Sequence, residues 1–455
     1  MLDVGTIVTS SVELLRIIKT MTVSALVPTP ATPTSARRTG LILSGGGARA
    51  AYQVGVLEAI ADLRIACGVQ HEPSPFPIIG GASAGAINAA ALACGSDNFD
   101  NAVRRIVNVW ANFHAHQVYR ADSVSMLRSG ARWMTVLSLG WLIAKWRRLK
   151  PKSLLDNTPL SELLTKLVPL ERIPKLIDEG HLQALAVSVS SYSTGEHVTF
   201  FQGHAQLKPW ARLQRRAIRA DITHQHLLAS SAIPFVFPAV ALQMDDQIAY
   251  FGDGSMRQSA PISPAIHLGA DRICVIGAAR TQEPRIPVQL PENRHYPTLA
   301  QIAGHALSSI FLESLAVDIE RVQRINQTLS LVPEDLRNAS NLRPVELLVI
   351  SPSERIDMIA ARYVDDLPAP VRTLLGGVGV SSNVADIKGS ALASYLLFEQ
   401  GFTRELMALG RKDTLHQRAE VCRFFGWTDP EAPAVVPVPP VHLGVERRRD
   451  PLRLR

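Results

Sequence analysis

The stretch PIIGGASAGAINAAALA at residues 77–93 combines a short apolar run, a turn of small residues and an alanine-rich helical segment. The same order occurs earlier, where the apolar residues 41–43 are followed by SGGG at 44–47 and by a helical composition over 48–63. Two consecutive strand–turn–helix units predict a βαβ crossover and therefore a parallel sheet. In such sheets, functional sites lie at the carboxyl ends of the strands.

The α/β pattern continues along the rest of the chain. Further strands are predicted at 185–190, 197–202, 248–251, 272–277 and 345–350. Helices are predicted at 218–229, at 300–329 as one long amphipathic helix, and at 390–425 behind the last strand. We therefore expect an α/β fold with a mostly parallel central sheet and an appended helical C-terminal region.

Composition and charge narrow the class of protein. The chain has 455 residues, of which 47% are hydrophobic, and this length allows either one large domain with extensions or two to three smaller domains. Its four cysteines have neither C-x-x-C spacing nor metal-ligand spacing to histidine, so we expect no metal and a reduced, cytosolic compartment. The formal net charge of +7 mostly serves solubility, and no nucleic-acid partner is expected.

Membrane-spanning and secretory segments are not predicted. No run of about 18 uninterrupted apolar residues occurs in the sequence. The first residues lack the basic start and the small-residue cleavage site of a signal peptide. Met21 is an alternative start to Met1.

The turn GASAG at residues 81–85 fits the G-x-S-x-G pattern of a nucleophile elbow. Small residues around Ser83, including Gly81 and Gly85, let the backbone crowd together and expose the hydroxyl at the edge of the sheet. The following helix N-terminus directs its amides at the same place, which stabilises a developing negative charge. The alternative interpretation is a tight turn with a capping serine.

A second glycine-rich turn, SGGGARA, occupies residues 44–50. Consecutive glycines can direct several N–H groups into one concavity, which suits either a phosphate or the oxyanion of a tetrahedral intermediate. A dinucleotide-binding loop would need an acidic residue at the end of the next strand, where Ser83 and its small neighbours stand instead. We therefore favour Gly45, Gly46 and Gly47 as an oxyanion loop.

The third motif is FGDGS at residues 251–255. Asp253 is flanked by Gly252 and Gly254 directly after an apolar strand, so its carboxylate is expected on a tight turn, as a catalytic base requires. Taken alone, the D-G pair is also common in plain turns. The motif indicates a catalytic aspartate only in combination with the other two motifs.

Together the three motifs resemble the patatin-like phospholipase family in order and spacing, over residues 41–268. Two further segments, LLDNTPL at 154–160 and ASSAIP at 229–234, are typical of bacterial members of that family. Ala50 stands where many members have glycine, and Ser255 where they have glycine or alanine. Both are small residues, and they leave the nucleophile and the carboxylate in place.

The resemblance implies a three-layer α/β/α fold and a Ser-Asp dyad that needs neither histidine nor cofactor. Ser83 would be the nucleophile, Asp253 the proton acceptor and the amides of residues 45–47 the oxyanion hole. The enzyme would cleave fatty acyl esters of lipids at a membrane surface through an acyl-enzyme, as a phospholipase A or lysophospholipase. Arg49 would lie beside the glycine loop, where it could contact a head group or form a structural ion pair.

The expected domain boundaries follow from the resemblance and from composition. A flexible segment and linker over 1–38 precedes a patatin-like catalytic domain over 39–353. A helical extension over 354–428 and a disordered basic tail over 429–455 complete the chain.

The competing enzyme hypothesis is an α/β-hydrolase with a Ser-Asp-His triad. His267, His305 and His416 follow Asp253 in the required order. Against it, the glycine-rich loop would be the first strand-to-helix turn of the fold, and the short distance to Ser83 leaves room for only one helix and one strand. A binding or scaffold role would require an incomplete site, and these motifs are complete.

Residues 132–152 are the candidate membrane contact. They carry Trp133, Trp141 and Trp146 among leucines, followed by a cluster of lysines and arginines. Tryptophan suits the membrane interface, and the cations attract anionic head groups. The alternative is an ordinary core helix or a lid. The expected localisation is cytoplasmic, with peripheral contact at the inner membrane face.

Overall fold

The computed structural model describes residues 37–120, 153–278, 296, 298–309, 313–339, 342–377, 380 and 387–431. The elements in them belong to the unit Arg38–Arg455. The predicted membrane contact at 132–152 lies outside the described residues, as do nearly all of the predicted linker and tail.

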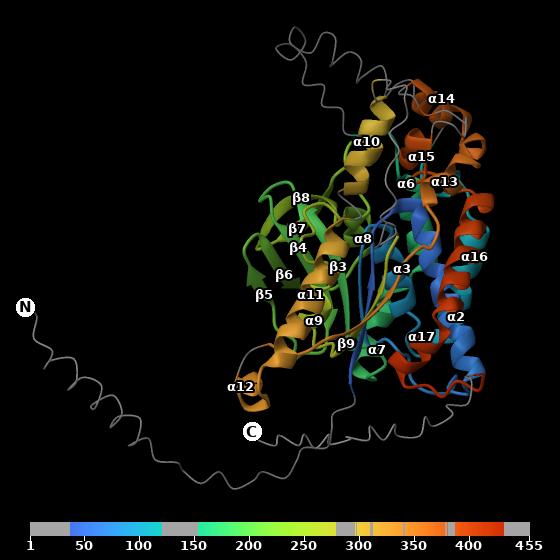
Figure 1. Cartoon of the computed structure of the whole chain (residues 1–455). Coiled ribbons are helices and arrows are strands. Elements are labelled where there is room, and N and C mark those ends of the chain that lie inside the picture. The colour runs from blue at the N-terminus through green and yellow to red at the C-terminus, as the bar shows by residue number, and fades with distance from the viewer. Residues whose placement is uncertain are drawn as a thin grey trace, which may run out of the picture. The chain divides into compact units, whose positions relative to one another are not determined.

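Ten strands of the described chain form one mixed sheet (Figure 1). Its main path runs β10 (Glu346–Ile350), β9 (Arg272–Ile276), β1 (Thr39–Leu43), β2 (Ile78–Ala82), β3 (Ala184–Ser191), β4 (His197–Gly203), β6 (Arg215–Arg219) and β5 (Trp210–Arg212). The hairpin of β7 (Val240–Met244) and β8 (Gln247–Asp253) joins the sheet at β3. Neighbours from β10 to β3 are parallel, whereas β4 and β8 run antiparallel to β3.

The central strands are apolar because helices cover both faces of the sheet. Every residue of β1 and β2 is buried, and so is all of β9 except its first residue. Continuous apolar runs, rather than alternating ones, are typical of parallel strands in this position. This confirms the parallel sheet predicted from the two strand–turn–helix units.

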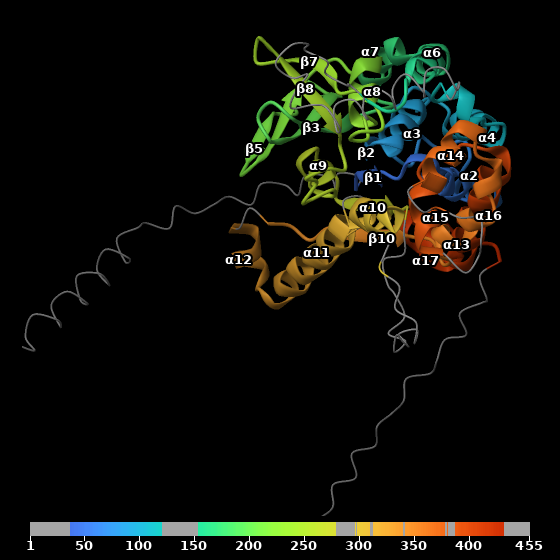
Figure 2. The same ribbon diagram turned by 90° about the horizontal axis from the view of Figure 1, so that it is seen from above.

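Figure 2 shows the layers from above. One face of the sheet carries α2 (Ala51–Ala66), α3 (Ala84–Ala93), α4 (Phe99–Ala111), α16 (Gln400–His416) and α17 (Arg418–Phe425). The other face carries α9 (Ser263–His267) and α11 (Ser314–Leu331), where Ile42 and Ile273 of the sheet pack with Ile319. The protein therefore has the three-layer α/β/α fold that the motifs implied.

The remaining elements are short. They are η1 (Gly47–Ala50), η2 (Ala115–Gln117), α6 (Thr158–Leu167), η3 (Leu170–Arg172), α7 (Ile173–Asp178), α8 (His224–Ser230), α10 (Leu299–Ser308), α12 (Glu334–Ala339), α13 (Ile356–Ala361), η5 (Val364–Asp366), α14 (Ala369–Gly377) and α15 (Ile387–Ala393). No helix in the described ranges is long and apolar enough to cross a membrane.

One sequence-based helix prediction needs correction. The predicted helix at 218–229 begins only at His224, because Ile218 lies in β6, which pairs with β4. Tertiary strand pairing overrides local helix propensity there. The long helix predicted at 300–329 corresponds to α10 and α11, and residues 310–312 between them lie outside the described residues.

The C-terminal helix α16 packs closely along α2. A Cβ on Gly55 of α2 would lie 1.8 Å from the carbonyl oxygen of Met407, and one on Gly410 of α16 would lie 2.2 Å from that of Tyr52. Two glycines, one on each helix, thus allow the backbones to touch. Tyr52 also donates its hydroxyl to Asp413 Oδ2 at 3.0 Å. The C-terminal region is therefore packed against the helix that follows the glycine-rich loop.

Candidate active site

Ser83 occupies the turn between β2 and α3, with φ 55° and ψ −134°. This is a strained conformation for a non-glycine residue, and it is typical of a nucleophile elbow. The motif glycines permit it. A Cβ on Gly81 would lie 2.5 Å from the carbonyl oxygen of Gly85, and one on Gly85 would lie 2.4 Å from the carbonyl oxygens of both Leu43 and Ser44. Gly85 thereby also lets α3 approach the loop that follows β1.

Asp253, the last residue of β8, contacts the serine directly. Ser83 Oγ donates to Asp253 Oδ2 at 2.6 Å, and the N–H of Ser255 donates to Oδ1 at 2.8 Å. A Cβ on Gly254 would lie 1.9 Å from the carbonyl oxygen of Ser188, so this turn requires glycine after the aspartate. The structure therefore brings the predicted nucleophile and the predicted proton acceptor into hydrogen-bond contact.

Burial changes the acidity of this carboxyl. Asp253 is 0% exposed, and the loss of solvation raises its pKa to about 7, even though the hydrogen bonds from Ser83 and Ser255 act in the opposite direction. An ordinary aspartate, with a pKa near about 3.9, is a weak base at neutral pH. A carboxyl that titrates near neutrality is a much better proton acceptor.

The sheet explains why these two residues meet. β2 pairs with β3 at Ala184–Ser188, and β8 pairs with β3 at Val189–Ser191. β4 occupies the other edge of β3, so β2 and β8 share one edge. Because they run in opposite directions, their carboxyl ends face each other. Ser83 follows one end and Asp253 forms the other.

The end of α8 and the residues directly after it hold both turns, and sequence reasoning did not assign them a role. Ser230 Oγ accepts from the N–H of Ser83 at 2.9 Å. The carbonyl oxygens of Ser230 and Ala232 accept from the N–H groups of Gly254 and Asp253, each at 3.0 Å. The only signal in the sequence was the family-like ASSAIP segment at 229–234. Its function here is to fix the relative position of the serine and the aspartate.

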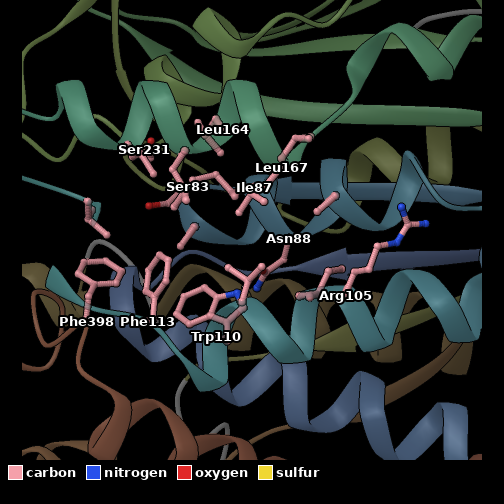
Figure 3. A pocket seen from close by; sticks show the side chains of 18 of the residues that line it. Ser83, Ile87, Asn88, Arg105, Trp110, Phe113, Leu164, Leu167, Ser231 and Phe398 are labelled. Carbon is pink, nitrogen blue, oxygen red and sulfur yellow. The ribbon is translucent and has the colours of Figure 1, made fainter. Parts of the chain in front are cut away.

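Ser83 opens into an apolar cavity of about 260 Å³ (Figure 3). The cavity is lined mainly by α3, α4 and α6, with apolar side chains that include Ile87, Trp110, Phe113, Leu160, Leu164, Phe237 and Phe398. Lining residues on the α3 side run from Ala84 to Gly95, so the cavity follows the whole helix. Arg105, near its far end, adds one of the few polar side chains.

The glycine-rich loop after β1 lies at the same cavity. Gly47 lines it together with Ser83, and Gly47 has φ 55°. The N–H of Ala48 donates to the carbonyl oxygen of Tyr395 at 3.1 Å. Within the described ranges, the N–H groups of Gly45, Gly46 and Gly47 have no hydrogen-bond acceptor. The loop therefore holds one amide in the fold and leaves three others without a protein partner there.

Arg49 is buried beside the glycine-rich loop. Its side chain is buried, its Nε donates to Ser394 Oγ at 2.7 Å, and its guanidinium carbon lies 4.4 Å from the ring centroid of Tyr395. Its guanidinium also donates to the carbonyl oxygen of Ala391 at 3.4 Å. Among the described residues these partners belong to the C-terminal region, and the head-group contact stays a prediction.

The histidines of the triad hypothesis are placed elsewhere. The ring of His267 stacks on Trp210 with centroids 4.7 Å apart, while His305 and His416 are exposed on α10 and α16. Among the residues that the structure describes, no histidine hydrogen-bonds to Ser83 or Asp253. Groups of three or more potential metal ligands are also absent from those ranges.

Comparison with known proteins gives a match to one domain model and distant similarities to several solved structures. No curated protein matches the sequence. VipD from Legionella pneumophila shares 13% identity over 82% of this chain and 67% of its own, with a TM-score of 0.28. The complex of SpcU with ExoU from Pseudomonas aeruginosa shares 13% identity over 87% of this chain and 82% of the matched chain, with a TM-score of 0.22.

The domain match is with the model of the patatin-like phospholipases, over residues 41–266. It begins in β1, just before the glycine-rich loop, and it ends beyond the Asp253 turn. Since it spans all three motifs, the chain belongs to the patatin-like phospholipase family, a family of lipid acyl hydrolases.

Proposed function

We propose that this protein is a serine lipid acyl hydrolase of the phospholipase A or lysophospholipase type, with Ser83 and Asp253 as a catalytic dyad. One observation carries the proposal. Ser83 Oγ lies 2.6 Å from a fully buried carboxylate and at the same time opens into an apolar cavity. A nucleophile paired with a base, beside a site for an acyl chain, is what ester hydrolysis of a lipid requires.

In the acylation step, Ser83 Oγ attacks the ester carbonyl carbon and its proton passes to Asp253 Oδ2. The carbonyl π electrons move to oxygen and form a tetrahedral oxyanion. When this intermediate collapses, the bond to the alcohol breaks and Asp253 returns its proton to the leaving oxygen. The products are the free alcohol, such as a lysolipid, and an acyl-enzyme on Ser83.

Deacylation repeats the sequence with water. Asp253 accepts a proton as the water oxygen attacks the acyl carbon, and Ser83 Oγ regains that proton as the fatty acid leaves. The pKa near 7 of Asp253 suits both directions, because the carboxyl must accept and release a proton in each half-reaction.

The amides of Gly45, Gly46 and Gly47 are proposed to bind the oxyanion. Gly47 lines the cavity beside Ser83, and these three N–H groups have no acceptor among the described residues. The N-terminus of α3, directly after Ser83, adds the positive end of a helix dipole. Donors that are already oriented stabilise the transition state more than the planar ester.

The cavity also indicates a preferred acyl length. α3 has ten residues, and a helix of that length extends about 15 Å. A fully extended chain of roughly ten to twelve carbons has a similar length, given C–C bonds of about 1.5 Å. We therefore propose that medium-length acyl chains are accommodated completely, while longer chains project past Arg105.

A lipid surface is the proposed source of substrate. The tryptophans and basic residues of 132–152 are proposed to dock on anionic bilayers, each cation contributing about 1 kcal/mol near the surface. Replacing Lys145, Arg147, Arg148 and Lys150 by glutamine should lower co-sedimentation with anionic liposomes and leave hydrolysis of a soluble ester intact. Unchanged sedimentation at low salt would contradict this contact.

The activity is tested by incubating the purified protein with phospholipids, lysophospholipids and triacylglycerols of defined chain lengths. Released fatty acids are identified by mass spectrometry. Ser83→Ala should release none and should remain folded by circular dichroism. Fatty acid release by Ser83→Ala at the wild-type rate would exclude Ser83 as the nucleophile, and His267→Ala inactivation would favour a triad instead.

A further inference from the structure

Residues 391–398 lie far beyond the family domain, yet they contact the glycine-rich loop. Tyr395 accepts the N–H of Ala48 at its carbonyl oxygen, at 3.1 Å. Ser394 Oγ accepts from Arg49 Nε at 2.7 Å, and Ser394 in turn donates to the carbonyl oxygen of Ala391 at 2.6 Å. Ser394 and Tyr395 are buried. The contacts therefore form a packed interface rather than a surface encounter.

We propose that residues 391–398, here called the clamp, position the oxyanion loop for catalysis. This rests on the proposed function, since it deepens the role of Gly45, Gly46 and Gly47. The clamp residues touch no substrate carbonyl themselves. They are positioning residues that act through the backbone of residues 47–49.

The contacts determine which amides of the loop face the reaction. Ala48 N–H is turned toward Tyr395 and is therefore withdrawn from the cavity. Gly47, one residue earlier, lines the cavity and has φ 55°. A Cβ on Gly47 would lie 2.3 Å from the carbonyl oxygen of Tyr395, so the clamp backbone presses directly on this glycine. Moving Tyr395 would free Ala48 N–H and allow the loop to rotate.

Arg49 connects the loop to the clamp side chains. Its guanidinium donates to Ser394 and stacks over the ring of Tyr395 at 4.4 Å. A planar guanidinium in contact with both a hydroxyl and an aromatic face holds one orientation, which lysine cannot reproduce. Arg49 therefore fixes the backbone that follows the oxyanion amides in one position relative to the clamp.

The same segment reaches the acyl site. Phe398 lines the cavity and packs on Phe113, with ring centroids 5.6 Å apart. Tyr119 donates its hydroxyl to the carbonyl oxygen of Leu396 at 3.0 Å, which anchors the segment between these two contacts. One C-terminal stretch therefore supports the oxyanion loop at one end and closes the acyl cavity at the other.

The test uses the full-length chain with Arg49→Lys, Ser394→Ala and the double variant. The matched control is Tyr52→Phe, which removes another buried hydrogen bond to the C-terminal region, the one to Asp413. For each protein, kcat and KM are measured with a soluble ester, and Tm is measured alongside. A fluorophosphonate, whose phosphoryl oxygen occupies the oxyanion position, reports the rate of covalent labelling.

Both single variants should lower kcat by about 10- to 100-fold with little change in KM, since oxyanion contacts strengthen only in the transition state. The labelling rate should fall in parallel. The double variant should be no worse than the poorer single variant, because both changes break one contact. Tyr52→Phe should keep its kcat even if its Tm falls.

Folded Arg49→Lys and Ser394→Ala proteins with wild-type kcat and labelling rates would overturn the proposed role of the clamp, but not the proposed function. The same holds if Tyr52→Phe loses as much kcat as they do for an equal fall in Tm. Wild-type protein that neither hydrolyses esters nor reacts at Ser83 would instead overturn the proposed function. If Ser394→Ala is unfolded at the assay temperature, Arg49→Lys, which keeps the charge and most of the volume, decides the matter.

Discussion

The turn at 81–85, here called the nucleophile turn after the proposed role of Ser83, and the glycine-rich loop at 44–47 look alike in sequence but are held in place differently. Each follows a parallel strand and leads into a helix. The nucleophile turn is held by its own glycines and by Ser230, all within the family domain. The glycine-rich loop is held inside that domain by Gln53, which donates to the carbonyl oxygen of Ser44 at 2.6 Å, and also from outside the domain, by Ser394 and Tyr395. Two turns with similar sequences can therefore be held in their conformations by different parts of the chain.

Gly85→Ala should have the largest effect, because this glycine lies where the two turns touch. The new Cβ would lie 2.4 Å from two backbone carbonyl oxygens, which cannot move aside without displacing the loop. We expect a loss of at least about 3 kcal/mol of folding free energy, or no folded protein. Urea denaturation measures this loss.

Gly376→Ala is the control, because no atom lies within 4 Å of its added Cβ. It should be neutral or slightly stabilising, since alanine is the better helix former. If Gly85→Ala behaves like Gly376→Ala, the two turns do not touch as closely as the structure indicates.

Asp253→Asn should affect activity and stability in opposite directions. We expect kcat to fall by about 10³-fold or more, because the amide cannot accept the proton of Ser83. The pKa of Asp253 is higher in the folded than in the unfolded chain, so its protonation stabilises the folded state. This contribution to the free energy of unfolding is complete below about pH 4 and is lost as the pH rises through about 7.

The asparagine stays uncharged, so Asp253→Asn should raise Tm at about pH 8 and change it much less at about pH 5. Thermal unfolding at both values measures the difference. An equal change in Tm at the two values would mean that burial does not raise the pKa of Asp253.

Ser230→Ala tests whether the nucleophile turn depends on its neighbour as the glycine-rich loop depends on the clamp. The change removes the acceptor of Ser83 N–H and should lower kcat by about 10- to 100-fold, because Ser83 loses its fixed orientation. The exposed Ser330→Ala on α11 is the control. A Ser230→Ala protein with wild-type kcat would show that the glycines alone hold the turn.

The pH dependence of kcat/KM is the smallest expected effect, and it distinguishes changes at the two turns. Only ionised Asp253 accepts a proton, so kcat/KM should rise with pH through about 7 and be about tenfold below its plateau at about pH 6. Arg49→Lys acts at the other turn and should lower the plateau without moving the midpoint. A midpoint near about 4 would mean that the carboxyl is not desolvated in the working enzyme.

Sequence reasoning reached the local parts of the site because each depends on neighbours in the chain. Small residues around Ser83 indicated a strained strand-to-helix turn, and the structure has φ 55° there. Asp253 was expected after an apolar strand, and it ends β8. The helix predicted at 218–229 failed where β6 pairs with another strand, since such pairing leaves no local pattern.

The sequence by itself determined the parallel core, the two glycine-rich turns and the aspartate turn, because strand, turn and helix signals act over a few residues. Only the tertiary structure decided that Ser83 meets Asp253, 170 residues away. The contact depends on β8 pairing antiparallel with β3 along the same edge as β2, just beyond the residues that β2 pairs with. It also decided the acidity of Asp253 and the burial of Arg49 against Ser394. Solvation and distant contacts are properties of the packed molecule, and no local pattern encodes them.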